Sequence, residues 1–273
     1  MISNVLSLIG RMGVPAAVYG VFWLARKYFP AAAKDSPSPQ CTTPISDEHL
    51  VSISWMVYAG MVVVGVLLAW ALHSLLITSN IFFAQRAGPA QFCLLPQTAV
   101  WWFLPGFAAL TLSWEIILCF MSLTAGRELT TSYRKWSNLK AGFDSAKTLR
   151  VLAVLVVLPI AVATALAVPM HANLYEDEIR VRAYASAHDE IYRYSAARRL
   201  TQIEGFRDRN GKLTKRAGIV VDFSDGRRWS SADYGNFRPT LDPALANYLQ
   251  QRIHLHLGSA ETESDIPTIA LAP

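Results

Sequence analysis

Val151–Met170 reads VLAVLVVLPIAVATALAVPM and contains no charged residue. As an α-helix, a run of this length spans about 30 Å, the thickness of the hydrocarbon core of a bilayer. The run separates an apolar first part of the chain from a polar last part. It therefore predicts a transmembrane helix. We expect Pro159 to kink this helix and to leave the carbonyl of Leu155 without its usual partner, and Pro169 to end it.

Charge is distributed unevenly between the two parts of the chain. Hydrophobic residues make up 52% and charged residues 16% of the 273 positions, a composition typical of membrane proteins. Before Asn173 there are eleven Lys and Arg and six Asp and Glu, whereas fourteen of each follow. The polar part thus lacks the basic surface of a nucleic-acid-binding domain, and no nucleic acid is expected as a partner. The three cysteines form no CxxC pair, which argues against a zinc site or a disulfide framework.

Three further apolar segments complete a predicted α-helical transmembrane bundle of about four helices, within residues 1–172. The predicted spans are residues 4–27, 51–77, 98–124 and 151–170. In the first segment the larger cluster of positive charge, Arg26 and Lys27, follows the apolar run, which argues against a cleaved signal peptide. Arg11 leaves open the alternative that this segment lies in the membrane interface.

The basic residues of the connecting loops predict the orientation of the bundle. The second loop holds only Arg86, whereas nine basic residues lie in or beside the first and third loops: Arg26, Lys27, Lys34, Arg127, Arg134, Lys135, Lys140, Lys147 and Arg150. Because such residues stay on the cytoplasmic side, the last span is expected to run outward. The sequence thus predicts a multi-pass protein of the plasma (inner) membrane with an extracytoplasmic C-terminal domain.

Residues 173–258 are expected to form a small soluble α+β domain, an antiparallel β-meander closed by a C-terminal helix. Apolar and polar residues alternate around Ile179–Ala183 and Ile219–Phe223, as in half-buried strands. Asn210-Gly211 is a typical hairpin turn.

The end of the chain combines a helix with a polar tail. Asp242 and Pro243 predict the start of the closing helix, as N-cap and first helical residue, and Gly258 predicts its end. Residues 259–273 are rich in Ser, Thr, Glu and Pro, and we expect them to be disordered.

The turn at Asp225-Gly226 allows two registers of the following hairpin. With a two-residue loop, Trp229 faces away from Val221. With a three-residue loop, Ser224–Gly226, and Gly226 in the left-handed conformation, Val221 pairs with Trp229. We predict the second register because it buries the tryptophan with the apolar face.

The layout of this domain resembles the pleckstrin-homology-like domains at the C-terminus of uncharacterised small polytopic membrane proteins of bacteria. The resemblance covers roughly Asp177–Leu257 and involves a Tyr-rich strand leading into RRLTQI, a hairpin through RNGK, the strand IVVDFSDGRRW and a closing helix. Such domains usually have seven strands, whereas at most five are predicted in this chain. They usually face the cytoplasm, so the resemblance implies a signalling or scaffold module on that side. It assigns no functional residue.

Glu115 is the one acidic residue inside a predicted span, and an isolated carboxylate in hydrocarbon costs a few kcal/mol. At 1.5 Å per residue, His73 and Arg11 lie toward the opposite leaflet and cannot reach it. Tyr58 lies at a similar depth and can donate a hydrogen bond. Glu115 and Tyr58 are thus a candidate intramembrane polar site, either a functional site or a contact that ties helices together.

The third loop is a candidate lipid-surface segment. It combines basic residues with aromatic residues at helical spacing, and its candidate contacts are Arg134, Lys135, Trp136 and Lys140. Such a helix can lie on the anionic inner leaflet. The alternative is that these are ordinary cytoplasmic positive charges.

No clustered nucleophile, base or metal ligand appears in the polar domain, and no cofactor-binding motif occurs in the chain. We expect a non-catalytic binding or assembly domain presented outside the cytoplasm. The expected partners are the lipid bilayer, anionic headgroups and another envelope protein, and no cofactor is expected. The alternatives are a membrane-embedded enzyme or small transporter that uses Glu115, and a cytoplasmic pleckstrin-like module.

Overall fold

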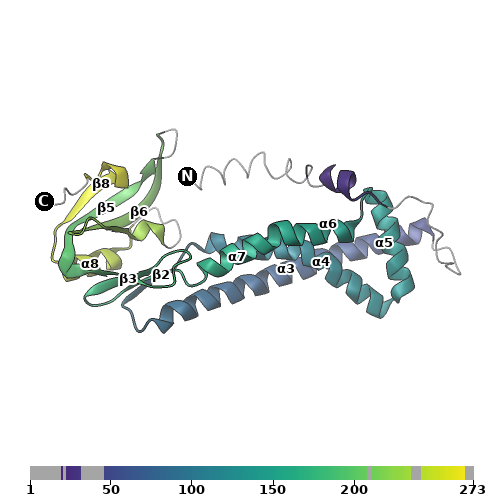
Figure 1. The fold of residues 1–273 in the computed structure, drawn as a ribbon, viewed down its shortest axis with the longest axis horizontal. Helices are drawn as coiled ribbons and strands as arrows, with labels where there is room; N and C mark the ends of the chain where they lie inside the picture. Colours follow the sequence, from purple (N-terminus) through teal and green to yellow (C-terminus); the bar gives the residue numbers. More distant parts are fainter. Residues whose placement is uncertain (1–19, 21–22, 32–45, 208–210, 235–240, 268–273) are drawn as a thin grey trace. The chain divides into compact units, whose positions relative to one another are not determined.

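The computed structural model describes residues 20, 23–31, 46–207, 211–234 and 241–267. The chain divides into two compact units, each of which is described by itself. Residues 2–74 and 102–162 form the helical unit, and residues 75–101 and 163–273 form the β unit. Figure 1 shows both units in the colours of the sequence.

Three helical segments are long and apolar enough to cross a membrane. They are α3 (Asp47–Arg86), η2 with α4 (Thr98–Trp102 and Phe103–Thr124), and α6, η3 and α7 in succession (Ser145–Leu152, Ala153–Val157 and Leu158–Ala167). The second and third of these segments overlap the predicted spans 98–124 and 151–170, and that they cross a membrane stays a prediction. The predicted span 4–27 lies mostly outside the described residues.

Helix α3 is longer than the predicted span 51–77, because it continues to Arg86. From Arg86, Gly88 and Pro89, the sequence predicts a loop over residues 78–96. No Pro or Gly occurs between Thr78 and Ala87, so the helix is not interrupted before Gly88, whose φ is +106°. Its last three turns belong to the β unit.

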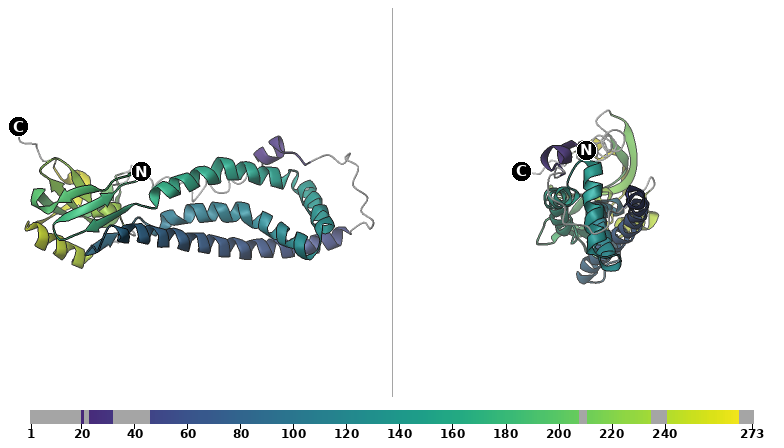
Figure 2. Two further views of the ribbon diagram at one scale, coloured as in Figure 1. Left: turned by 60° about the horizontal axis from the view of Figure 1, so that its bottom comes forward. Right: turned by 90° about the vertical axis from the view of Figure 1, so that its right-hand side faces the viewer.

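In the helical unit, α3 and α4 pack closely over small residues. A Cβ at Gly60 would come within 2.9 Å of Ile117, and one at Gly65 within 3.9 Å of Ser113. Two further helices follow, α5 (Arg127–Ala141) and α6, and Figure 2 shows α5 crossing from the end of α4 to the start of α6. The aromatic side chains of α5 complete an apolar cluster built from Leu50, Ile53, Val57, Trp114, Leu118, Met121 and Tyr133.

Pro159 is accommodated by a π turn, η3. The N–H of Leu158 donates to the carbonyl of Ala153, one residue further back than in an α-helix. Pro159 has no N–H for the carbonyl of Leu155, as the sequence predicts. The irregularity expected at the proline thus takes the form of a widened turn just before it.

The end of α7 is held within the β unit by side chains of α3 and β2 (His171–Leu174). The helix ends at Ala167, two residues before Pro169, in agreement with the expected end. Asn80 donates through Nδ2 to the carbonyls of Val168 and Met170, at 2.6 and 2.8 Å. Asn173 donates to the carbonyl of Ala84 in the same way, at 2.8 Å.

The first sheet of the β unit has the order β1-β2-β3-β4, with all neighbours antiparallel. The other three strands are β1 (Phe92–Leu94), β3 (Glu178–Arg182) and β4 (Glu190–Arg193). β1 comes from the connection between α3 and α4. The predicted domain boundary at 172/173 is therefore wrong. The sequence does not reveal β1, because a three-residue strand in a loop is too short to show an alternation of apolar and polar residues.

The second sheet has the order β7-β6-β5-β8. Its strands are β5 (Ala197–Arg207), β6 (Leu213–Phe223), β7 (Arg228–Ser230) and β8 (Leu257–Thr262). β8 runs parallel to β5, so the sheet is not a purely antiparallel meander. Part of the tail that was expected to be disordered, residues 259–273, forms this strand, because the backbone of β5 gives its polar residues hydrogen-bonding partners.

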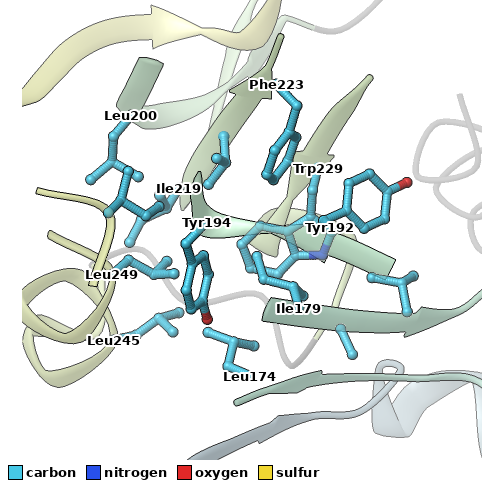
Figure 3. Packing of buried hydrophobic residues seen from close by; sticks show 14 of the residues in the cluster. Leu174, Ile179, Tyr192, Tyr194, Leu200, Ile219, Phe223, Trp229, Leu245 and Leu249 are labelled. Carbon is cyan, nitrogen blue, oxygen red and sulfur yellow. The ribbon is translucent and has the colours of Figure 1, made fainter. Parts of the chain in front are cut away.

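The core of the β unit lies between the two sheets and helix α8 (Pro243–Ile253), as Figure 3 shows. Val221 pairs with Trp229, and Gly226 has a φ of +80°, so the predicted three-residue hairpin loop is confirmed. Trp229 is 3% exposed. The N-cap at Asp242 is confirmed, but α8 ends earlier than expected, with His254 rather than Gly258 in the left-handed cap conformation.

Candidate functional site

Glu115 of α4 forms an ion pair with Arg134 of α5. One guanidinium nitrogen, Nη2, lies 2.9 and 2.7 Å from the two carboxylate oxygens. Counted from the helix ends at Thr124 and Arg127, the two residues lie at similar distances along their helices, about 14 and 11 Å at 1.5 Å per residue. Gly126 adopts a φ of +91° in this turn. The turn thus brings the acid and the base together, and Glu115 is not an isolated charge.

A pocket of about 320 Å³ opens beside this ion pair, between α4 and α5. Its polar lining consists of Glu115, Ser122, Arg127, Thr130, Thr131 and Arg134. Both threonine hydroxyls donate to backbone carbonyls one turn earlier. Within the described part of the chain Arg127 forms no ion pair, so it is the pocket's uncompensated charge. The pocket was not predicted from the sequence; the signal that could have found it was the glycine turn between two helices that each carry a charge.

An aromatic cluster lies next to the ion pair. Tyr133 is fully buried, and its ring centroid lies 6.3 Å from that of Trp114 and 5.9 Å from that of Trp136. Burial, with a smaller effect from Tyr58, raises the pKa of Tyr133 to about 12, so the phenol stays neutral. The Tyr133 hydroxyl, both indole N–H groups and Nε of Arg134 have no hydrogen-bond partner. The buried region beside the pocket is therefore rich in unused donors.

Tyr58 does not fill the role suggested for it. Its side chain is half exposed on α3, and Glu115 instead accepts both of its hydrogen bonds from Arg134. Tyr58 contributes to the surroundings of Tyr133 rather than to the carboxylate. The candidate pair Glu115 and Tyr58 is thus replaced by Glu115 and Arg134, a pairing that depends on the turn after α4.

The four candidate lipid contacts lie on one helix, but they do not share one environment. Lys135 is exposed, and the ammonium group of Lys140 lies 4.4 Å from the ring centroid of Trp136. Trp136 itself packs against the buried Tyr133, and Arg134 holds Glu115. The amphipathic helix is present, but its aromatic face packs on the helical unit. Contact of its basic face with lipid stays a prediction.

A second charged cluster lies in the β unit. Asp222 is 5% exposed and accepts from Arg199 at 2.8 Å and from Arg228 at 2.6 Å. This aspartate is fully satisfied by two guanidinium groups, so it serves the stability of the second sheet. Among the described residues, no three His, Cys, Asp or Glu side chains converge as a metal site would require.

Comparison with known proteins gives no relative for this chain. No protein-family profile matches the sequence. No curated protein and no solved structure is detectably similar to it. Function is therefore inferred from the residues alone.

Proposed function

We propose that the protein is a multi-pass protein of the plasma membrane that presents its β unit outside the cytoplasm as a non-catalytic binding or assembly domain. The observation that carries the multi-pass arrangement is the pairing of β1 with β2. β1 precedes α4 and β2 follows α7, so two candidate spans separate the paired strands. Paired strands lie on one side of a membrane, which requires an even number of crossings between them.

The basic residues support the outward orientation. Arg127, Lys135, Lys140, Lys147 and Arg150 all lie on α5 and α6, the connection opposite to the one that supplies β1. Under the positive-inside rule this connection is cytoplasmic, and the β unit is then extracytoplasmic. A cytoplasmic pleckstrin-like role would need the reverse orientation.

A binding role agrees with the surface of the first sheet. β4 is an edge strand, and Ile191 on it is 44% exposed. Tyr184, which follows β3, is 51% exposed. Large exposed apolar side chains on and near an edge strand are features of protein contact sites, so another envelope protein is the proposed partner.

The rival role, an enzyme or transporter centred on Glu115, has less support. A proton relay or an ion site needs a carboxylate that can exchange its partner. Both oxygens of Glu115 are held by Arg134, and the ion pair explains the presence of an acid in α4 without a catalytic task.

Fusions to alkaline phosphatase, which is active only outside the cytoplasm, test the proposal. We expect activity for fusions after Ala87 and Pro273 and none after Arg150. Activity at Arg150 alone would place the β unit in the cytoplasm. Different results at Ala87 and Pro273 would show that β1 and β2 do not pair.

The binding role has its own test. We expect Ile191→Asp to release the protein from a larger assembly on native gels of gently solubilised membranes, and the matched change Thr214→Asp, at an exposed position of β6, to leave that assembly intact. Migration of the unaltered protein as the free chain would contradict the binding role without affecting the orientation.

A further inference from the structure

We propose that the α4–α5 pocket binds the phosphate of an anionic phospholipid headgroup, with Arg127 as its principal ligand. The site lies within the helical unit, so it is compatible with either orientation of the protein.

The depth of the pocket suits a headgroup. Trp101 and Trp102 begin the apolar part of the η2–α4 segment, and about 20 residues of helix cross the hydrocarbon core. The opposite boundary then falls near Ser122, which lines the pocket. Arg127 lies just beyond this boundary, at the level where phospholipid phosphates are found. The pocket therefore opens where a lipid phosphate is already concentrated.

The charges of the pocket suit a single anion. Glu115 and Arg134 neutralise each other, while Arg127 lines the same pocket without an ion pair among the described residues. The net charge of the lining is therefore +1. A phospholipid such as phosphatidylglycerol carries one negative charge on its phosphodiester, which matches this lining.

The donors of the pocket suit phosphate oxygens. Arg134 holds Glu115 through Nη2, and its Nε is buried, so its main role in the pocket is to hold the carboxylate. Arg127 offers a complete fork, and Ser122 offers a hydroxyl. Arginine forks bind phosphate oxygens in pairs, more tightly than neutral donors do. Thr130 and Thr131 direct their hydroxyl hydrogens to the backbone, and we assign them no donor role.

Glu115 should weaken the binding of an anion in the pocket, and a substitution of Glu115 tests this effect. Its carboxylate repels an anion and occupies Arg134. Glu115→Gln removes the negative charge and raises the net charge of the lining to +2. Binding of an anionic headgroup should become several-fold tighter, whereas a proton-relay role for Glu115 predicts no such gain.

Native mass spectrometry of the full chain in detergent, with added phosphatidylglycerol or phosphatidylcholine, tests the proposal. We expect one retained phosphatidylglycerol and no retained phosphatidylcholine. Arg127→Gln should weaken retention by about tenfold, the effect of one charged hydrogen-bonding partner. Arg150→Gln removes the same charge from an exposed position of α6 outside the pocket and should have little effect.

Three outcomes would overturn the proposal. Equal losses for Arg127→Gln and Arg150→Gln would mean that lipid is attracted by the general charge of α5 and α6. Displacement of the lipid by excess inorganic phosphate would make the pocket a site for free phosphate. Weaker retention in Glu115→Gln, with the thermal stability of the chain unchanged, would contradict the assigned charge balance.

Discussion

Cys93 in β1 lies opposite Asn173 in β2, although two helices long enough to cross a membrane separate them in the sequence. Pairing between strands that flank two candidate spans constrains the membrane topology in a way that hydropathy alone does not. If both helices cross a bilayer, the connection after α3 and the segment after α7 lie on the same side of it.

The cysteine itself offers a test of the side. In a chain with Cys41 and Cys119 changed to Ser, we expect Cys93, which is exposed, to react with a membrane-impermeant maleimide added to intact cells. Although the residue is exposed, partial burial of its sulfur raises the pKa of the Cys93 thiol above its ordinary value, so less thiolate is present at neutral pH. Labelling should therefore be slow at pH 7 and accelerate by up to about tenfold per pH unit toward alkaline pH.

The control for this labelling is a cysteine at the opposite connection. Lys147→Cys in a chain with no other cysteine places an exposed thiol on α6, and it should react only after the cells are permeabilised. The reverse pattern, with Cys93 protected and the new cysteine labelled, would place the β unit in the cytoplasm.

Asn80 should be essential to the end of α7. Asn80→Asp replaces the donor to the carbonyls of Val168 and Met170 with an acceptor, so we expect a loss of about 3 kcal/mol in stability. The midpoint of thermal unfolding in detergent reports this loss. Thr78→Ala, on the same helix, should change it little. Similar effects of the two changes would mean that Asn80 does not hold the chain end.

Gly205 tolerates no side chain in the irregular part of β5. A Cβ there would lie 2.2 Å from the carbonyl oxygen of Thr214. Gly205→Ala should therefore cost about 1–3 kcal/mol through displacement of β6. In Gly258→Ala the nearest atom is the carbonyl oxygen of Leu200 at 3.7 Å, and unfolding should be nearly unchanged. Equal unfolding midpoints for the two variants would contradict the close approach of β6 to Gly205.

Asp222 should hold the second sheet together through its two arginines. Asp222→Asn leaves Arg199 and Arg228 without their shared carboxylate, and we expect a loss of about 2–3 kcal/mol at pH 7. Both arginines are 28% exposed, so the loss should be smaller than for a fully buried pair. Chemical denaturation measures it, and Asp225→Asn, at an exposed turn, is the control. A loss no larger than that of the control would show that the cluster does not stabilise the sheet.

The parts of the fold that could be predicted from the sequence are those that depend on interactions between neighbouring residues. The N-cap at Asp242 depends on neighbouring residues alone, and the pairing of Val221 with Trp229 follows from burying one face of a short hairpin. The same holds for the apolar runs of α4 and α7. Each of these features is specified within a few residues of sequence.

The features that were missed depend on partners far away in the chain. β1 has only three residues and is a strand because β2 pairs with it, and β8 depends in the same way on β5. Helix depth suggests a partner for Glu115 within the spans, whereas Arg134 lies on the polar helix after the glycine turn. A comparison of depths along straight spans does not include residues of a helix that follows a turn and packs back against the span.

Because β1 comes from the connection between α3 and α4, the order of synthesis also constrains the order of folding. During synthesis the chain makes β1 first, and in the proposed topology α4 and α7 are both inserted before β2 pairs with it. The first sheet therefore cannot close until the last candidate span is in place. A strand of three residues offers little edge for wrong partners during this interval. In the proposed topology, completion of the first sheet thus reports that both candidate spans have been inserted.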